Sequence, residues 1–280
     1  MVPRLPRSVL WIAGIVAGLA AYAFGGRARR ASLRNLAAVL PMAGERTLQR
    51  FARRAFVHAA WSYIETFALP ALSREHVIAS YSVAGWEHLE EALAAGRGVI
   101  MVSAHVGSPV AAGQVLAVRG VPTSVVVEPI QPPRLFHLMT RVRGSFGLRF
   151  IPSDRSAVRD IVRALRQNEV VGMMCDRDVA GTGMPLAFFG KETSVTTAPA
   201  TLALRTGAAM LPAVAYRTGL FAGAARIDPP IDIPTSGSHA ANVRELTARV
   251  TQRIESLIRA HPEQWAVFED IWPYGTMPRT

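Results

Sequence analysis

The sequence predicts an α/β fold: a mixed, mostly parallel central sheet flanked by helices, preceded by an N-terminal membrane helix. From Trp86 onward, short strand-like runs alternate with longer helix-like segments, which is the pattern of a sheet with crossover helices. Before them, residues 9–26 form an uncharged apolar run with arginines on both sides. The chain has 280 residues, of which 50% are hydrophobic, so it can bury a large core.

The apolar run at residues 9–26 predicts the membrane helix. Eighteen helical residues rise about 27 Å, close to the roughly 30 Å of a bilayer core, so a single-pass helix and shallow insertion both fit. Residues 21–23, Ala-Tyr-Ala, resemble a signal-peptide cleavage site, and a cleaved signal is therefore the alternative. The run is followed by three basic residues, Arg27, Arg29 and Arg30, which are typical of a stop-transfer flank. By the positive-inside rule, they place the protein on the cytoplasmic face of the inner membrane.

Residues 31–80 are predicted to be a helical region between the anchor and the sheet. Apolar side chains recur every three or four positions over residues 45–67, which predicts an amphipathic helix. Its other side carries four arginines: Arg46, Arg50, Arg53 and Arg54. They either bind an anionic membrane surface, each contributing about 1 kcal/mol of binding free energy, or form an ordinary solvated face.

The α/β domain is predicted over residues 81–280, after the anchor at 1–30 and the helical region at 31–80. Strands are expected at residues 99–104, 123–127, 148–151, 170–175 and 210–216. Helices are expected at residues 86–95, 110–119, 133–142, 156–167, 197–206 and 242–260. The last of these has an apolar side, so we expect it to pack on the sheet.

Composition narrows the classes of function. The net charge of +11 favours an anionic partner. Nucleic-acid-binding motifs are absent and an apolar anchor would not accompany them, so an anionic membrane surface is favoured over nucleic acid. The sequence has no G-x-S-x-G, phosphate-loop, dinucleotide or H-E-x-x-H motif, and its histidines lack metal-ligand spacing, so no metal site is expected. The single cysteine, Cys175, lies in an apolar run and is predicted to be a buried thiol.

Two strand ends carry polar residues suited to chemistry. His105 follows the run at 99–104, and a side chain at such a strand end can project into a crevice. A histidine there can exchange a proton near neutral pH. The alternative is a histidine with a structural role only. Residues 175–178, Cys-Asp-Arg-Asp, follow the run at 170–174 and either share that crevice or form a solvated turn. Arg141 and Arg143 either bind phosphate or end a solvated helix.

The chain resembles a known family over nearly its whole length. In order along the chain, the motifs that carry the resemblance are Ala-Ser-Leu-Arg-Asn-Leu at 31–36, Gly-Trp-Glu-His-Leu at 85–89, Gly-Arg-Gly-Val-Ile at 96–100, Ala-His-Val-Gly-Ser at 104–108, Phe-Phe-Gly at 188–190, Thr-Gly-Ala at 206–208, Leu-Pro at 211–212 and His-Pro-Glu-Gln-Trp at 261–265. The most specific of them are the strand followed by His-x-Gly-Ser and the late His-Pro-Glu-Gln-Trp. With these motifs the chain resembles the lysophospholipid acyltransferase-like enzymes, in the group of the lipid A lauroyl/myristoyl and phosphatidylinositol mannoside acyltransferases.

The resemblance implies a catalytic histidine followed, after four intervening positions, by an acidic residue that orients it. His105 matches the histidine, but the acidic position is Val110, which cannot orient an imidazole. Either another acid replaces it or the chain is catalytically impaired. Asp176 is the preferred replacement because its strand end can lie beside that of His105; the other candidates are Asp178, Glu128 and Glu192.

The resemblance also implies the reaction. An acyl thioester of coenzyme A or of acyl carrier protein would be the co-substrate, no cofactor would be bound, and the acceptor would be a hydroxyl of a glycolipid or phospholipid in the membrane. Backbone N–H groups near Gly107 and Ser108 would stabilise the oxyanion. Arg143 would contact a phosphate or the thioester side. The remaining substrate-binding candidates are Arg141, Arg177, Asp178 and Glu192.

Two other functions fit the same residues. A lipid-binding protein without activity would explain Val110, and a thioester hydrolase would differ only in using water as the acceptor. Residues 186–189 either wall a groove for the acyl chain or belong to the ordinary core.

Overall fold

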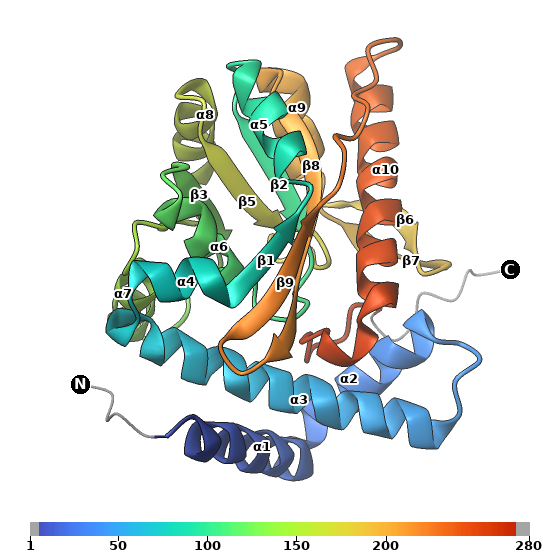
Figure 1. Ribbon diagram of the computed structural model, residues 1–280. Helices are drawn as coiled ribbons and strands as arrows, with labels where there is room; N and C mark the ends of the chain where they lie inside the picture. Colours follow the sequence, from blue (N-terminus) through green and yellow to red (C-terminus); the bar gives the residue numbers. More distant parts are fainter. Residues whose placement is uncertain (1–5, 273–280) are drawn as a thin grey trace, which may run out of the picture.

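The computed structural model describes residues 6–272, so the outer ends of the expected anchor and of the α/β domain lie outside it. Its main feature is a seven-stranded sheet (Figure 1). Neighbouring strands are parallel except for β8 and β9, so the sheet is mixed and mostly parallel, as predicted. The spatial order is β1 (Tyr81–Ala84), β9 (Ala222–Ile227), β8 (Ala209–Gly219), β2 (Val99–Ser103), β5 (Val170–Met174), β3 (Thr123–Val127) and β4 (Arg149–Pro152).

Helices pack on both faces of the sheet. The long α10 lies on one face and buries Leu246, Ile254 and Ile258 completely, because its apolar residues share one side. That face is covered by α8 (Ala157–Arg166), α9 (Ala198–Thr206) and α10 (His239–Ala260). The other face is covered by α4 (Arg74–Ser80), α5 (Trp86–Ala94) and α6 (Pro109–Val118), while α7 (Pro133–Arg143) joins β3 to β4.

The predicted strands and helices of the α/β domain are all present, with ends displaced by at most three residues. The sequence reading missed β1, β9 and the separate hairpin of β6 (Met184–Phe188) and β7 (Lys191–Val195). β1 reads Tyr-Ser-Val-Ala and β9 reads Ala-Gly-Ala-Ala-Arg-Ile, without the β-branched runs that favour strands. These strands are specified by pairing within the sheet rather than by local propensity.

Three helices precede the sheet: α1 (Arg7–Phe24), α2 (Gly26–Val39) and α3 (Glu45–Ala68). α3 runs across the edge at which β2 and β5 end, and α1 lies along its outer side (Figure 1). The two helices are antiparallel, with Trp11 stacked on Trp61 at a ring-centroid distance of 3.9 Å and Tyr22 against Phe56. Within residues 6–272, α1 is the one helix long and apolar enough to cross a membrane.

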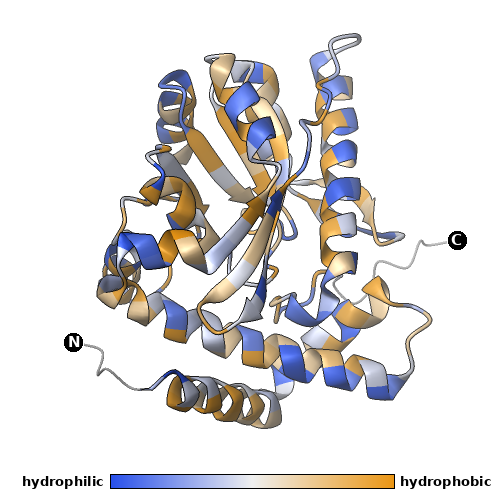
Figure 2. Ribbon diagram, in the orientation of Figure 1, coloured by the Kyte–Doolittle hydropathy of each residue, from blue (hydrophilic) through white to orange (hydrophobic). Residues whose placement is uncertain are grey.

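α1 has a small inner face and an apolar outer face. Gly14 and Gly18 are buried against α3, whereas Val9, Ile12 and Val16 are 44–61% exposed. Figure 2 shows how largely hydrophobic the helix is. Because glycines let helix backbones approach closely, the inner face packs on α3. The outer face exposes apolar side chains, as helices that lie in a membrane interface do.

Enlarging Gly18 is expected to detach α1 from α3. A Cβ at this position would lie 2.5 Å from the Val57 Cα and 2.9 Å from the Phe56 carbonyl oxygen, and backbone atoms cannot move aside as a side chain can. We expect trypsin to cleave Gly18→Leu after Arg27 about tenfold faster than the wild type. Val16→Leu, which enlarges the exposed face of the same helix, is the control, and equal cleavage of both variants would contradict the packing.

Candidate active site

The site is built where two neighbouring parallel strands end. β2 and β5 are in register, with Ser103 paired to Met174. His105 and Asp176 each follow two residues later, so the strand pairing carries both side chains to the same place at the edge of the sheet. After β2, the chain forms β3 and β4 and then returns to insert β5 between β2 and β3. Such a reversal of the strand order is a topological switch point, at which a crevice opens outside the carboxyl ends of the strands.

Asp176 holds the His105 imidazole. The Asp176 Oδ1 and the His105 Nδ1 are 2.8 Å apart, and the Asp176 Oδ2 accepts the His105 backbone N–H at 2.8 Å. Burial would raise the pKa of Asp176, but the charge and hydrogen bonds of His105 and a bond from Trp265 outweigh burial and hold that pKa below its ordinary value. The ionised carboxylate therefore keeps the proton on Nδ1 and leaves the Nε2 lone pair free to accept a proton.

Burial differs sharply between the two partners. The side chain of Asp176 is fully buried, whereas that of His105 is 33% exposed. A carboxylate removed from water and an imidazole with one open side form the arrangement that general-base chemistry needs. The proximity expected of His105 and Asp176 is confirmed; their catalytic role remains a prediction.

The segment after α10 supports this pair, a role that the sequence reading did not assign to it. The Trp265 indole Nε1–H donates to the Asp176 Oδ2 at 2.8 Å, and the Ala266 N–H donates to the His105 carbonyl at 2.8 Å. Trp265 belongs to the His-Pro-Glu-Gln-Trp motif, and it is only 2% exposed. A buried tryptophan usually needs a hydrogen-bond acceptor for its indole N–H, and this was the one sign of the role of Trp265 in the sequence. The sequence does not identify the acceptor.

The turn after His105 is tightly held. Gly107 has φ +64°, and a Cβ there would lie 2.2 Å from the Ala215 carbonyl oxygen, so glycine is required. Its N–H donates to the Gln264 carbonyl at 3.0 Å, which corrects the expectation that this N–H is open to an oxyanion. Ser108 is 3% exposed and its hydroxyl donates to Glu65, so its side chain is engaged inside the protein and not with substrate.

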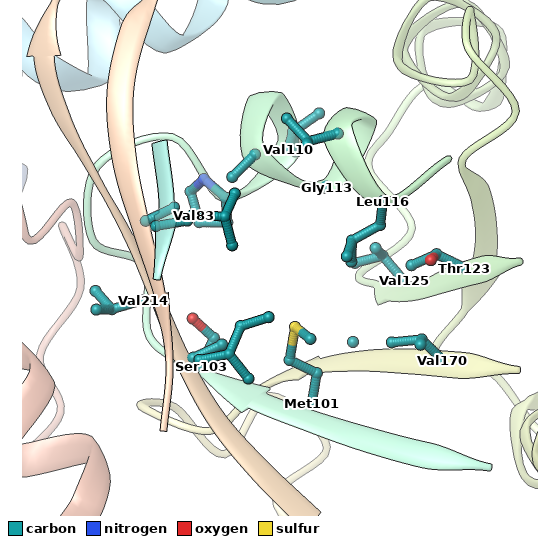
Figure 3. Close-up of a pocket in the computed structure, with 18 of the residues that line it drawn as sticks. Val83, Met101, Ser103, Val110, Gly113, Leu116, Thr123, Val125, Val170 and Val214 are labelled. Atoms are coloured by element: carbon teal, nitrogen blue, oxygen red, sulfur yellow. The ribbon is translucent and has the colours of Figure 1, made fainter. Parts of the chain in front are cut away.

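Val110 contributes to an apolar cavity of about 100 Å³ between α6 and the sheet (Figure 3). Ser103 and Met174, the last residues of the strands that carry His105 and Asp176, also line this cavity, whereas His105 and Asp176 themselves do not. Residues 186–189 are not among its lining, and Phe188 and Phe189 belong to the core beneath α10. Core packing is therefore confirmed for Phe188 and Phe189, whereas Leu186 is partly buried and Ala187 is exposed.

Arg143, at the end of α7, is a partly buried cation without an acidic partner among residues 6–272. Burial lowers its pKa, and its Nε is buried with no hydrogen-bond partner in that range. The Gln114 side chain donates to the Arg143 carbonyl at 2.8 Å, while its own buried Oε1 is unpaired. The buried, unpaired Arg143 Nε and Gln114 Oε1 are a donor and an acceptor that an anionic or hydroxylated ligand could satisfy. Arg141 is exposed on the same helix.

The other candidate residues serve contacts away from the His105 ring. Arg177 forms ion pairs with Glu269 at 2.7 Å and with Glu128 at 3.4 Å. The Asp178 Oδ2 accepts the Gly183 N–H and the Ser194 hydroxyl, so this carboxylate braces the loop before β6. Glu192 is exposed on the β6–β7 hairpin. Of the four acids considered for the imidazole, Asp176 is the one that contacts it.

A buried charged cluster lies between α3 and the turn, and the sequence reading missed it. The Arg217 guanidinium binds both oxygens of Glu65, at 3.0 and 2.6 Å, and its Nη1 lies 3.0 Å from the His58 Nδ1. Burial, followed by the charges of Arg217 and Arg54, lowers the pKa of His58 to about 3. His58 is therefore neutral in the folded protein and accepts the bond from Arg217.

The lowered pKa of His58 predicts loss of stability in mild acid. The unfolded chain takes up a proton near pH 6.5 and the folded chain only near pH 3, so the free energy of unfolding falls as pH drops through that interval. Between pH 7.5 and 5 we expect a loss of about 2 kcal/mol from this residue, measured by chemical unfolding in detergent. His58→Asn keeps an acceptor for Arg217 but does not titrate, so it should flatten the pH dependence; an unchanged slope would refute this assignment.

The fold and the site together define the class of the protein. It is an α/β protein in which a buried carboxylate holds a partly exposed histidine, an arrangement suited to proton transfer. The chain belongs to the family described as bacterial lipid A biosynthesis acyltransferase, which it matches over residues 1–273.

Named relatives lie in two branches. A phosphatidylinositol mannoside acyltransferase of Mycobacterium tuberculosis is 33% identical over 74% of this chain and 66% of its own length, just under two thirds. One from Mycolicibacterium smegmatis is 28% identical over 85% of this chain and 78% of its own length. The Escherichia coli lipid A biosynthesis palmitoleoyltransferase is 27% identical over 94% of this chain and 84% of its own length.

Proposed function

We propose that the protein is a membrane-associated O-acyltransferase at the cytoplasmic face of the inner membrane. It would transfer a fatty acyl group from a thioester of coenzyme A or acyl carrier protein to a hydroxyl of a glycolipid or phospholipid. The observation that carries this proposal is the 2.8 Å contact between His105 and Asp176, because it supplies the acid that Val110 does not. The mannoside relatives favour a phosphatidylinositol mannoside acceptor over a lipid A precursor.

The mechanism needs no covalent acyl-enzyme. The His105 Nε2 takes the proton of the acceptor hydroxyl, whose oxygen attacks the thioester carbonyl. Asp176 stabilises the imidazolium that forms. The Ser108 N–H would be a donor for the developing oxyanion. When the tetrahedral intermediate collapses, the thiolate leaves and takes its proton from the imidazolium, which releases an ester and a free thiol.

The apolar cavity supports the choice of an acyl substrate. Its lining is almost wholly aliphatic and includes Val110, Leu116, Val125 and Val170. Figure 3 shows α6 side chains facing strand side chains across it. An apolar cavity along the two strands that lead to His105 and Asp176 would take part of the donor's hydrocarbon chain out of water. In this arrangement Val110 is part of the cavity wall, while Asp176 takes the orienting role.

The packing of α1 favours shallow insertion over a membrane span. To cross a bilayer, α1 would have to leave α3 and expose the Gly14 and Gly18 face, with loss of the Trp11–Trp61 stack. Lying on α3, it presents its apolar outer face to one leaflet, and the basic side of α3 lies close by. We therefore propose a monotopic protein whose site edge faces the lipid acceptor.

The test is acyl transfer by the full chain in detergent or vesicles. Radiolabelled palmitoyl-coenzyme A and palmitoyl acyl carrier protein are offered separately, each with phosphatidylinositol mannosides, lysophospholipid or a lipid A precursor. The expected result is a labelled lipid ester from one donor, formed by the wild type. Labelled free fatty acid alone would identify a thioester hydrolase, and stoichiometric lipid binding without product would identify the lipid-binding alternative; both would refute the proposal.

A further inference from the structure

The buried Glu65 of α3 accepts more hydrogen bonds than its ion pair requires. Its two oxygens receive the Arg217 guanidinium, and its Oε1 also receives the Phe221 N–H at 3.2 Å. Its Oε2 receives the Ser108 hydroxyl at 2.9 Å. Glu65, Arg217 and Ser108 are each 3–4% exposed, so water competes little for these bonds.

Ser108 occupies the position that begins α6, yet it does not cap that helix. A serine there normally accepts a bond from one of the first helical N–H groups. In this protein the side chain makes no such bond and donates to Glu65 instead. Local helix physics therefore does not explain the orientation of the hydroxyl, whereas the charge on Glu65 does, because a bond to a buried carboxylate is stronger than a neutral capping bond.

A second hydroxyl from α3 holds the same turn. The Ser62 Oγ accepts from the Arg217 Nη2 at 3.0 Å, and its one proton lies between the His58 carbonyl at 3.0 Å and the Gly107 carbonyl at 3.2 Å. The charged cluster thus contacts the two residues directly before α6, both within three residues of His105. On the other side, Gln264 holds the Gly107 N–H. The turn is clamped between α3 and the segment after α10.

We propose that Glu65 is a positioning residue for the His105 turn, acting through Ser108. The buried pair with Arg217 fixes the carboxylate, the carboxylate fixes the Ser108 hydroxyl, and this bond sets the place of the Ser108 backbone N–H relative to the imidazole. Small displacements of a catalytic group reduce turnover steeply. The inference rests on the proposed acyl transfer for its kinetic test, and its structural test is independent of activity.

The lead variant is Ser108→Ala, because it removes the bond and leaves the Glu65–Arg217 pair intact. Removing one member of a buried ion pair is far more disruptive, so Glu65→Gln is the second variant. We expect each to lower kcat about tenfold with an unchanged KM for the donor, since the bond matters for positioning and not for substrate affinity. In the double variant kcat should be no lower than in the worse single variant, because both changes break one connection.

Thr251→Val is the matched control for the loss of a buried hydroxyl. Thr251 lies on α10, is 4% exposed and bonds only within its own helix, so its removal should lower thermal stability to a similar extent and leave kcat unchanged. A fall of kcat in Thr251→Val equal to that in Ser108→Ala would mean that general destabilisation explains the loss. Multiplying losses in the double variant would mean that Ser108 acts without Glu65. A raised KM in Ser108→Ala would mean that its hydroxyl serves substrate affinity and not positioning; each of these results overturns the proposal.

Hydrogen exchange at residues 104–112, followed by mass spectrometry, tests the positioning without any substrate. We expect the Gly107 amide to exchange about tenfold faster in Ser108→Ala than in the wild type, and Thr251→Val to match the wild type. Unchanged exchange in Ser108→Ala overturns the proposal. Glu65→Gln should show the same faster exchange as Ser108→Ala. If the wild type transferred no acyl group, the proposed function would fail while these exchange results would still decide whether the Glu65–Ser108 bond holds the turn.

Discussion

His105→Ala is expected to lower the rate of acyl transfer about 10⁴-fold. The His105 side chain is 33% exposed while its Nδ1 is held by Asp176, and a positioned general base contributes up to about 10⁴ in rate. The KM for the thioester should change little, because the aliphatic cavity that would hold the acyl chain is left intact. The measurement is the initial rate of labelled lipid ester formation.

His239→Ala is the matched control for this loss. His239 is exposed at the start of α10, away from the sheet edge that carries His105, and its removal should leave the rate unchanged. Wild-type turnover by His105→Ala would eliminate the proposed base. Folding of the variant is checked by its circular dichroism and by its retention on vesicles.

Asp176→Asn is expected to cost almost as much, about 10³- to 10⁴-fold in kcat. The amide can replace the carboxylate sterically, but its NH₂ group would donate to the His105 Nδ1. The ring would then carry its proton on Nε2, where it cannot accept another; the equivalent change in a serine protease triad costs about 10⁴. The loss should not be recovered by raising the donor concentration.

Two further variants separate orientation from general damage at Asp176. Trp265→Phe keeps an aromatic ring but removes one of the bonds to Asp176, so its kcat should fall less than that of Asp176→Asn. Asp232→Asn changes an exposed carboxylate and should have no effect. If Asp176→Asn turned over at the wild-type rate, some other acid or no acid would orient the ring.

Much of the fold follows from local sequence. The strands β2 and β5 are apolar runs that end at turn residues, and α10 has an apolar side that matches its burial. The edge strand β1 and its neighbour β9 could not be predicted in the same way. Their short Ala- and Gly-containing sequences have weak strand propensity, so pairing with the rest of the sheet decides their conformation.

The site was partly predictable for a different reason. Two polar residues after two buried runs indicated that His105 and Asp176 could share a crevice, and strand register places them together. What sequence alone could not give is which strands are neighbours, because β5 lies between β2 and β3 only in space. The buried Glu65 was hidden for the same reason: its partners lie 43 and 152 positions away in the chain.

The most direct test of the account is whether His105 and Asp176 act as one unit. Initial rates of labelled acyl transfer would be compared for the wild type, His105→Ala, Asp176→Asn and the double variant. If the carboxylate acts by holding the imidazole, adding Asp176→Asn to His105→Ala should reduce the rate no further. Losses that multiply in the double variant, or a rate that survives the removal of His105, would contradict the account.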